Sequence, residues 1–118
     1  MIDKKESILN ALKSDVELTS LIADKVYWIR PASTPKPPYI TFFELSNSED
    51  ASADDNEFSD QIEYQVDIWS SSSFSQIAKA TQRVMRSLGF THVSLPDQFE
   101  EDTGIFHKAM QFTINEEV

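Results

Sequence analysis

Residues 61–69 alternate between polar and apolar side chains, and this pattern constrains the fold more than any other feature of the chain. Successive side chains of a β-strand point to opposite faces, so a period of two predicts a strand with one buried face and one wet face. The expected buried positions are Ile62, Tyr64, Val66 and Ile68. The buried face needs a covering layer, which favours a mainly antiparallel sheet with helices packed on one side.

Four further segments are rich in β-branched and aromatic residues and are predicted to be strands. They are residues 26–30, 39–45, 90–95 and 105–114. Residues 39–45 are almost continuously apolar, which predicts a strand covered on much of both faces and therefore central in the sheet. The last two strands flank an acidic turn at 96–104, which predicts a terminal hairpin. Four prolines within residues 31–38 exclude helix and strand pairing, so an extended connector is expected there.

Two helices are predicted near the amino terminus. Residues 3–13 have apolar side chains at helical spacing, with Asp3 and Glu6 as a capping pair at the start. The same capping spelling recurs at residues 14–17, with Ser14 as the expected cap, and is followed by apolar residues at helical spacing. A short second helix is therefore expected to turn the chain toward the sheet.

A third, longer helix is predicted at about residues 73–88, with Ser73 as its cap and Gly89 at its end. Its apolar residues fall on one side, so the helix is amphipathic. Three cations, which we call the basic stripe, share the opposite side: Lys79, Arg83 and Arg86. The stripe is either an interface or an ordinary soluble outer face, and the sequence favours neither.

The order of these elements predicts an α+β fold. We expect a mainly antiparallel sheet of four to five strands, with the N-terminal helix and the long amphipathic helix packed on one face. A chain of 118 residues has the commonest domain size, so residues 1–118 are expected to form a single domain with one core.

Residues 46–60 carry many carboxylates and no basic residue, and are predicted to be a mobile loop between two strands. Its acidic side chains are Glu49, Asp50, Asp54, Asp55, Glu57 and Asp60. The segment lacks the spacing and the glycine of a calcium-binding loop, which favours a solvated loop over a metal site. Because the loop and the basic stripe have opposite charges, contact between copies of the chain is a further hypothesis.

The sequence offers no combination of residues typical of catalysis. His92 and His107 are the only histidines, and neither has a partner at the spacing of a zinc site. The serines at 70–73 lack a nucleophile motif, and the two glycines are too few for a phosphate-binding loop. The chain has no cysteine. We therefore expect a protein that is not an enzyme and that has no cofactor and no metal.

The charge of the chain argues against nucleic acid as a ligand. Twenty acidic and ten basic residues give a net charge of −10, whereas sequence-independent DNA binding depends on clustered cations. The amino terminus lacks the apolar core of a signal peptide, and no apolar run is long enough for a membrane helix. We expect a soluble protein made in the cytoplasm, with no membrane partner and no sequence-specific nucleic acid partner.

Three segments together resemble one known family. They are residues 18–27 (LTSLIADKVY), 37–42 (PPYITF) and 64–69 (YQVDIW), the last followed by a serine-rich turn and a helix. Their order and spacing over roughly residues 5–90 resemble the tail completion and tail terminator proteins of long-tailed phages and prophages, a family that includes head-to-tail joining proteins. The last third matches only in outline, as strands ending in residues 112–114.

The resemblance implies an α+β fold and a structural role in the virion tail without catalysis. It implies self-association into a ring, commonly a hexamer, at the head-proximal end of the tail, although a monomer before docking is also consistent with it. The implied partners are the tail tube protein and the head connector or head-closure protein. The acidic residues of 46–60 are candidates for the ring lumen or for contacts between subunits, because a negative lumen repels the DNA that must pass.

The sequence leaves two alternative functions open. One is a different virion joint, such as a head-closure or connector protein. The other is a small binding or regulatory domain of non-viral origin. The first differs from a tail terminator in position within the particle, and the second differs in class.

Overall fold

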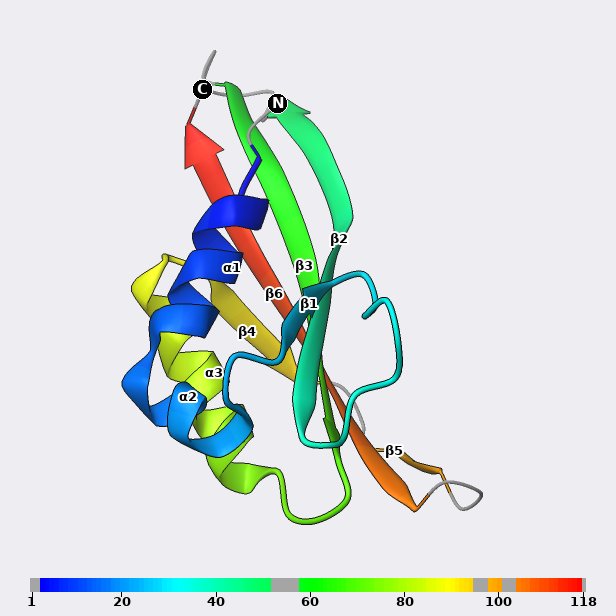
Figure 1. Cartoon of the computed structure of the whole chain (residues 1–118). Helices are drawn as coiled ribbons and strands as arrows, with labels where there is room; N and C mark the ends of the chain where they lie inside the picture. Colours follow the sequence, from blue (N-terminus) through cyan, green and yellow to red (C-terminus); the bar gives the residue numbers. More distant parts are fainter. Residues whose placement is uncertain (1–2, 52–57, 95–97, 101–103, 118) are drawn as a thin grey trace.

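The computed structural model describes residues 3–51, 58–94, 98–100 and 104–117 (Figure 1). Three helices and six strands follow one another along the chain. In order they are α1 (Lys5–Ser14), α2 (Val16–Ile22), β1 (Val26–Trp28), β2 (Tyr39–Ala51), β3 (Phe58–Ser70), α3 (Ser75–Ser87), β4 (Thr91–Ser94), β5 (Gln98–Glu100) and β6 (Ile105–Glu117). The molecule is elongated, with extents of 50 × 28 × 26 Å.

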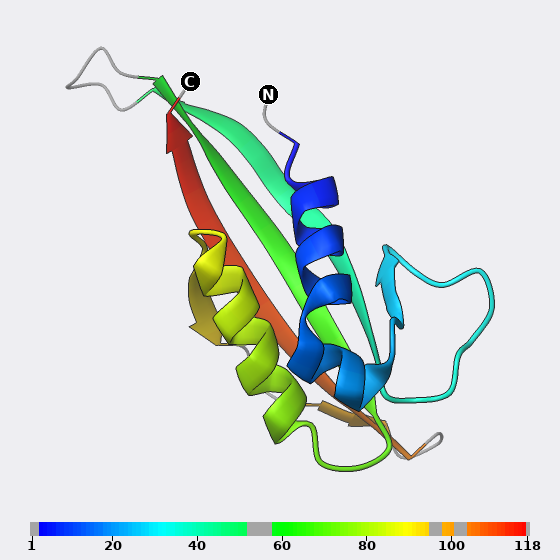
Figure 2. The ribbon, with the colours of Figure 1, turned by 60° about the vertical axis from the view of Figure 1, so that its left-hand side comes forward.

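One sheet with the order β1-β2-β3-β6-β4 forms the centre of the fold, and β5 also pairs with β6. Every pairing is antiparallel except that of β1 with β2. The three helices lie on one face of this sheet (Figure 2). The predicted α+β fold is confirmed.

The alternating strand forms the middle of the sheet and supplies the centre of the core. Ile62, Tyr64, Val66 and Ile68 of β3 are all fully buried beneath the helices. The aromatic rings of Phe42, Tyr64 and Trp28 lie 5.3 to 6.3 Å apart at this interface. The prediction that residues 39–45 would be central in the sheet is confirmed in that β2 lies between β1 and β3, although the middle strand of the order is β3.

Part of the acidic segment 46–60, which was predicted to be a loop, belongs to two strands. Residues 46–51 continue β2, and residues 58–60 begin β3, so Ser46 pairs with Glu63 and Ala51 pairs with Phe58. A ladder can continue through polar residues when both strands are already held in register by the apolar residues below them. The remaining residues 52–57, including Asp54, Asp55 and Glu57, lie outside the described part of the chain.

The predicted terminal hairpin also needs correction. β4 and β6 pair in antiparallel fashion, but residues 98–100 of the expected turn form β5, which pairs with the start of β6. Both short strands therefore lie along the same side of β6, opposite β3.

All three described helices start differently from the prediction. Asp15, and not Ser14, caps α2, since its Oδ2 accepts the Leu18 backbone N–H at 3.1 Å. At α3 the first flanking residue is Phe74, which makes no side-chain capping bond, so Ser73 is not the cap. At α1 the flanking residue is Lys4, which makes no side-chain capping bond, although Asp3 Oδ1 accepts the Lys5 backbone N–H at 2.9 Å.

The predicted end of α3 at Gly89 is confirmed. Gly89 has φ +97° and donates its N–H to the Arg86 carbonyl at 2.9 Å, while the Phe90 N–H reaches the Met85 carbonyl at 3.1 Å. This pair of bonds closes the helix and sends the chain into β4. A Cβ at this position would also lie 3.0 Å from Ile114 Cδ1.

We expect Gly89→Ala to lower the free energy of unfolding by about 1–2 kcal/mol, because alanine is strained at positive φ and its methyl group would press on Ile114. Urea denaturation followed by circular dichroism measures the loss. Gly89→Asn is the matched control, since asparagine tolerates this backbone conformation better and should recover part of the loss. Equal stability of wild type and Gly89→Ala would contradict the assignment of this helix end.

The buried phenol of Tyr64 predicts a loss of stability at alkaline pH. Burial, together with the nearby carboxylates of Glu44 and Asp3, raises the pKa of Tyr64 to about 12. The unfolded phenol ionises at about pH 10, so the stabilising effect of the neutral form is complete below that pH and declines as pH rises toward 12. Tyr64→Phe should therefore lose less stability than wild type between these pH values. Parallel pH curves in urea denaturation would contradict this expectation.

Candidate functional site

The helix-free face of the sheet carries a row of aromatic side chains that crosses four strands. Tyr39, Trp69 and His107 are direct register partners on β2, β3 and β6, and Tyr27 of β1 extends the row. Ring centroids are 6.2 Å apart for Tyr27 and Tyr39 and 6.1 Å for Tyr39 and Trp69. Trp69 and His107 stack at 4.0 Å with nearly parallel planes. We call these four residues the aromatic row.

A buried carboxylate lies against this row. Asp67 is only 4% exposed although it lies on the face predicted to be wet. Its Oδ1 is 2.7 Å from His107 Nε2 and accepts a hydrogen bond from Gln65 Nε2 at 2.8 Å. Beside it, Trp69 Nε1 donates to Thr41 Oγ1 at 3.0 Å. The polar atoms of this face therefore bond to one another across three strands, which shields the carboxylate from water.

The contacts between Asp67 and His107 indicate a structural pair. Both side chains are largely buried, and the histidine ring is held between the carboxylate and Trp69. Catalysis by such a pair needs a nucleophile within reach. The other group bonded to the carboxylate is the Gln65 amide, which is not a nucleophile, and the Thr41 hydroxyl is bonded to Trp69. In the described part of the chain, no group of three or more histidine, aspartate or glutamate side chains is arranged to hold a metal ion.

The fold brings Arg83 of the basic stripe into contact with two carboxylates of another helix and its cap. Arg83 Nη2 binds Asp15 Oδ2 at 2.8 Å and Glu17 Oε1 at 3.2 Å, so it joins α3 to the start of α2. Lys79 and Arg86 are exposed on the same helix. All three members of the predicted stripe are thus exposed, and Arg83 in addition joins two helices.

The Arg83 contact also changes the titration of its partner. The hydrogen bond from Arg83 lowers the pKa of Asp15 below its usual 3.8, with the Leu18 backbone N–H acting in the same direction and burial opposing it. Arg83 is itself more than half exposed, so solvent screening limits the value of the ion pair.

Asp15→Ala should lower stability by about 1 kcal/mol at neutral pH, because α2 loses its cap as well as the Arg83 contact. A lowered carboxylate pKa stabilises the fold above about pH 4, and the effect is lost as pH falls through the folded pKa. The stabilities of wild type and variant should therefore converge in strong acid. Urea denaturation at several pH values tests this, with Glu17→Ala as the control, which removes an Arg83 partner but no cap. A constant difference down to strong acid would contradict the role of the Asp15 charge.

The acidic candidates are only partly placed by the structure. Glu49 and Asp50 lie in β2 and Asp60 lies in β3, where Glu49 is the register partner of Asp60. These positions gather at the end of the β2–β3 ladder that is distant from α2 and β5 (Figure 1). The other three candidates are among the residues that the structure does not describe.

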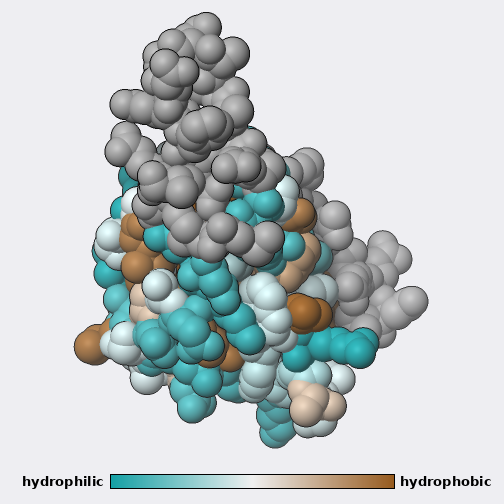
Figure 3. All heavy atoms as spheres, turned by 90° about the horizontal axis from the view of Figure 1, so that it is seen from above, coloured by the Kyte–Doolittle hydropathy of each residue, from teal (hydrophilic) through white to brown (hydrophobic). Residues whose placement is uncertain are grey.

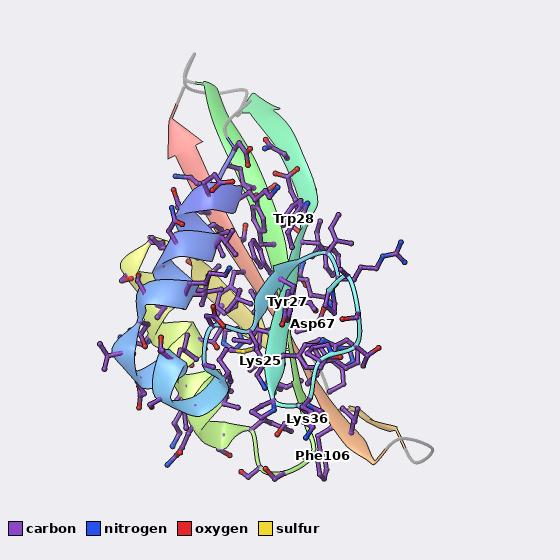
Figure 4. All side chains as sticks on the ribbon, in the orientation of Figure 1. Lys25, Tyr27, Trp28, Lys36, Asp67 and Phe106 are labelled. Carbon is purple, nitrogen blue, oxygen red and sulfur yellow. The ribbon has the colours of Figure 1, made fainter. Side chains whose placement is uncertain are left out.

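A hollow lined by both hydroxyl and apolar groups lies where β3 turns into α3. Its lining comes from α2, the end of the proline-rich connector, the end of β3, the turn after β3 and the first turn of α3: Leu21, Pro38, Ser70, Ser72, Ser73, Gln76 and Ile77. Ser73, expected as a helix cap, thus lines this hollow. Figure 4 shows the lower end of the sheet, where Phe106 lies close to this turn and packs edge-on against Phe74 at 6.2 Å.

Seen from above, hydrophobic residues occur in small separate groups among polar ones (Figure 3). None of the described helices is both long and apolar enough to cross a membrane.

One family model and two solved structures match the chain. The family model described as Tail completion protein gp17 matches residues 6–116. A chain of the "Virion of native gene transfer agent (GTA) particle" has a TM-score of 0.69 and 13% sequence identity, with 94% of this chain and 92% of that chain covered. The "Structure of bacteriophage SPP1 gp17 protein" has a TM-score of 0.50 and 18% identity, with 97% and 90% covered. No curated protein sequence matches the chain.

Proposed function

We propose that this chain, which belongs to the tail completion protein gp17 family and is a phage tail assembly protein, forms a ring at the head-proximal end of the tail. There it ends the growth of the tail tube, joins the tail to the head, or does both. Its partners are further copies of itself, the tail tube protein on one side and the head connector or head-closure protein on the other.

The observation that carries this proposal is the extent of the family match. The family match spans residues 6–116. It therefore includes the last strands, for which the sequence alone showed a resemblance only in outline. The fold is also similar to that of a chain from the gene transfer agent virion, over nearly the whole of both chains. Family membership favours this role over the non-viral binding domain considered from the sequence.

A net charge of −10 suits a ring that DNA must cross. A negative lumen repels phosphates and keeps DNA from binding to the wall during passage. Glu49, Asp50 and Asp60 gather at one end of the β2–β3 ladder, where their positions suit the lumen or a contact between subunits. Asp54, Asp55 and Glu57 belong to the same proposal through their place in the sequence.

Electron microscopy of particles made without this protein tests the proposal. Overlong tails indicate a terminator, whereas tails of normal length that are not attached to heads indicate a joining protein or another head-tail connector. Complementation with the wild-type gene should restore complete particles. Complete, joined particles in the absence of the protein would refute both roles.

A further inference from the structure

Both edges of the sheet leave strand backbone open in the described part of the chain. On one side β1 pairs only with residues 40–42 of β2, so β2 continues beyond β1 without a neighbour on that side. On the other side β4 is the last strand of the order. Figure 2 shows β1 and β4 at opposite borders of the sheet. Open strand edges are templates for pairing with another chain.

Exposed apolar side chains mark both edges. On the β1–β2 side, Ile29 is 56% exposed and Leu45 is 42% exposed; on the β4 side, Val93 is 48% exposed. Ile29 has φ +65°, which is strained for a β-branched residue, and its turn ends β1. Leu45 lies at the irregularity between Glu44 and Ser46 in the β2 ladder. The turn at Ile29 and the irregularity at Leu45 restrict the β1–β2 edge to a specific partner, since bulges and short strands discourage indiscriminate pairing.

The charges beside the two edges differ in sign. Glu44 is a residue of β2 next to the irregularity, and burial together with the charges of Glu44 and Asp3 raises the pKa of the Tyr64 phenol, so both carboxylates lie near it. Arg86 is in the last turn of α3 and Lys108 is in β6, and burial together with these two cations lowers the pKa of His92 in β4, so both cations lie near it. With a net charge of −10, copies of this chain repel one another at long range, so a stable contact between them needs local complementarity of this kind.

The directions of the edge strands fit a head-to-tail arrangement. β1 runs parallel to β2, whereas β4 and β2 run in opposite directions because each step from β2 to β3, β6 and β4 is antiparallel. Rotation about an axis along the strands keeps these directions. The β4 edge of one copy therefore meets the β1–β2 edge of the next in antiparallel orientation, which is the more stable kind of pairing.

We propose that copies of this chain join through these two edges, the β1–β2 edge with Leu45 and Glu44 against the β4 edge with Val93 and Arg86 of the next copy. Such a heterologous contact uses a different surface on each partner and closes into a ring when the rotation between copies permits. The inference rests on the proposed ring and specifies which surfaces form its joints.

Cysteine cross-linking tests the joint directly, since the natural chain has no cysteine. Leu45→Cys and Val93→Cys chains are mixed and treated with a short bismaleimide. We expect several-fold more mixed dimer than in a mixture of Val16→Cys and Val93→Cys. Val16 is a matched control because it is 84% exposed but lies on the helix α2 and not on an edge strand. Equal yields from the two mixtures would overturn the proposal.

Two further outcomes separate the alternatives. If Leu45→Cys alone cross-links as well as the mixture does, the contact is two-fold and the head-to-tail order is wrong. A charge-exchange pair tests the electrostatic part: Glu44→Lys and Arg86→Glu should each reduce the mixed dimer, and mixing the two variants should restore it. Lys79→Glu has the same change of charge on α3 and should have no effect. Cross-linking at these edges together with normal particles in the absence of the protein would refute the proposed function but not the joint.

Discussion

Phe42→Ala is expected to lower the free energy of unfolding by about 3–5 kcal/mol, the usual cost of emptying a large aromatic site in a core. Phe42 is fully buried beneath the helices, with its ring 5.3 Å from that of Trp28 and 6.3 Å from that of Tyr64. Domains of this size are stable by about 5–15 kcal/mol, so this single change removes a large share of the total. Urea denaturation followed by tryptophan fluorescence measures the loss.

Phe43→Ala is the control for this change, because it removes the same ring from the next residue of the same strand. Phe43 points to the helix-free face and is only partly buried. The helices give Phe42 a covering layer that Phe43 lacks, so the control should cost clearly less. Equal losses at the two positions would show that the helix-free face is packed as tightly as the helix-covered face.

Asp67→Ala is expected to have the second largest effect, a loss of about 2–3 kcal/mol, because buried donors are left without an acceptor. His107 Nε2 and Gln65 Nε2 both lie within 2.8 Å of Asp67 Oδ1. Removal of this oxygen leaves the histidine stacked on Trp69 without its polar partner. The loss should appear as a lower midpoint of urea denaturation with an unchanged slope.

A double-mutant cycle separates the Asp67–His107 contact from other effects of the substitution. If the two side chains stabilise each other, Asp67→Ala and His107→Ala together should cost less than the sum of the single changes. Asp67→Asn keeps an oxygen acceptor and should be milder than Asp67→Ala. Additive costs would assign the stability to packing of the aromatic row alone.

The parts of the fold that sequence predicted well depend on neighbours close in the chain. The alternation at residues 61–69 indicated which side of β3 is buried, because the pleat alone decides it. The prolines at 31–38 excluded regular pairing through their own geometry. Gly89 marked the end of α3 because a positive φ favours glycine there.

The parts that were predicted wrongly depend on partners far along the chain. Residues 46–51 look like a loop by composition, but β3 supplies hydrogen-bonding partners for them. Asp67 looked like a solvent-facing residue of an alternating strand, but the register brings His107 of β6 to its side. Arg83 is exposed on α3 as expected for an outer stripe, but the sequence did not show that α2 presents Asp15 to it. A helical wheel or a strand pattern contains no information about such partners.

The aromatic row was missed for the same reason, although one signal was present. Trp69 breaks the alternation of its strand by placing a large ring on the polar side. A large aromatic residue at such a position indicates that the supposedly wet face has packing partners of its own. Their identity follows only from the register of β2 and β6 with β3.

The position of β6 in the sheet has a consequence for when the chain can fold during its synthesis. β6 is inserted between β3 and β4, although both precede it in the chain. Neither β4 nor β5 has a partner in the sheet until β6 has been synthesised, and β3 exposes a long unpaired edge until then. Closing such distant pairs is slow compared with forming a hairpin. A chain that stops before β6 therefore lacks the ordered β4 edge on which the proposed joint between copies depends.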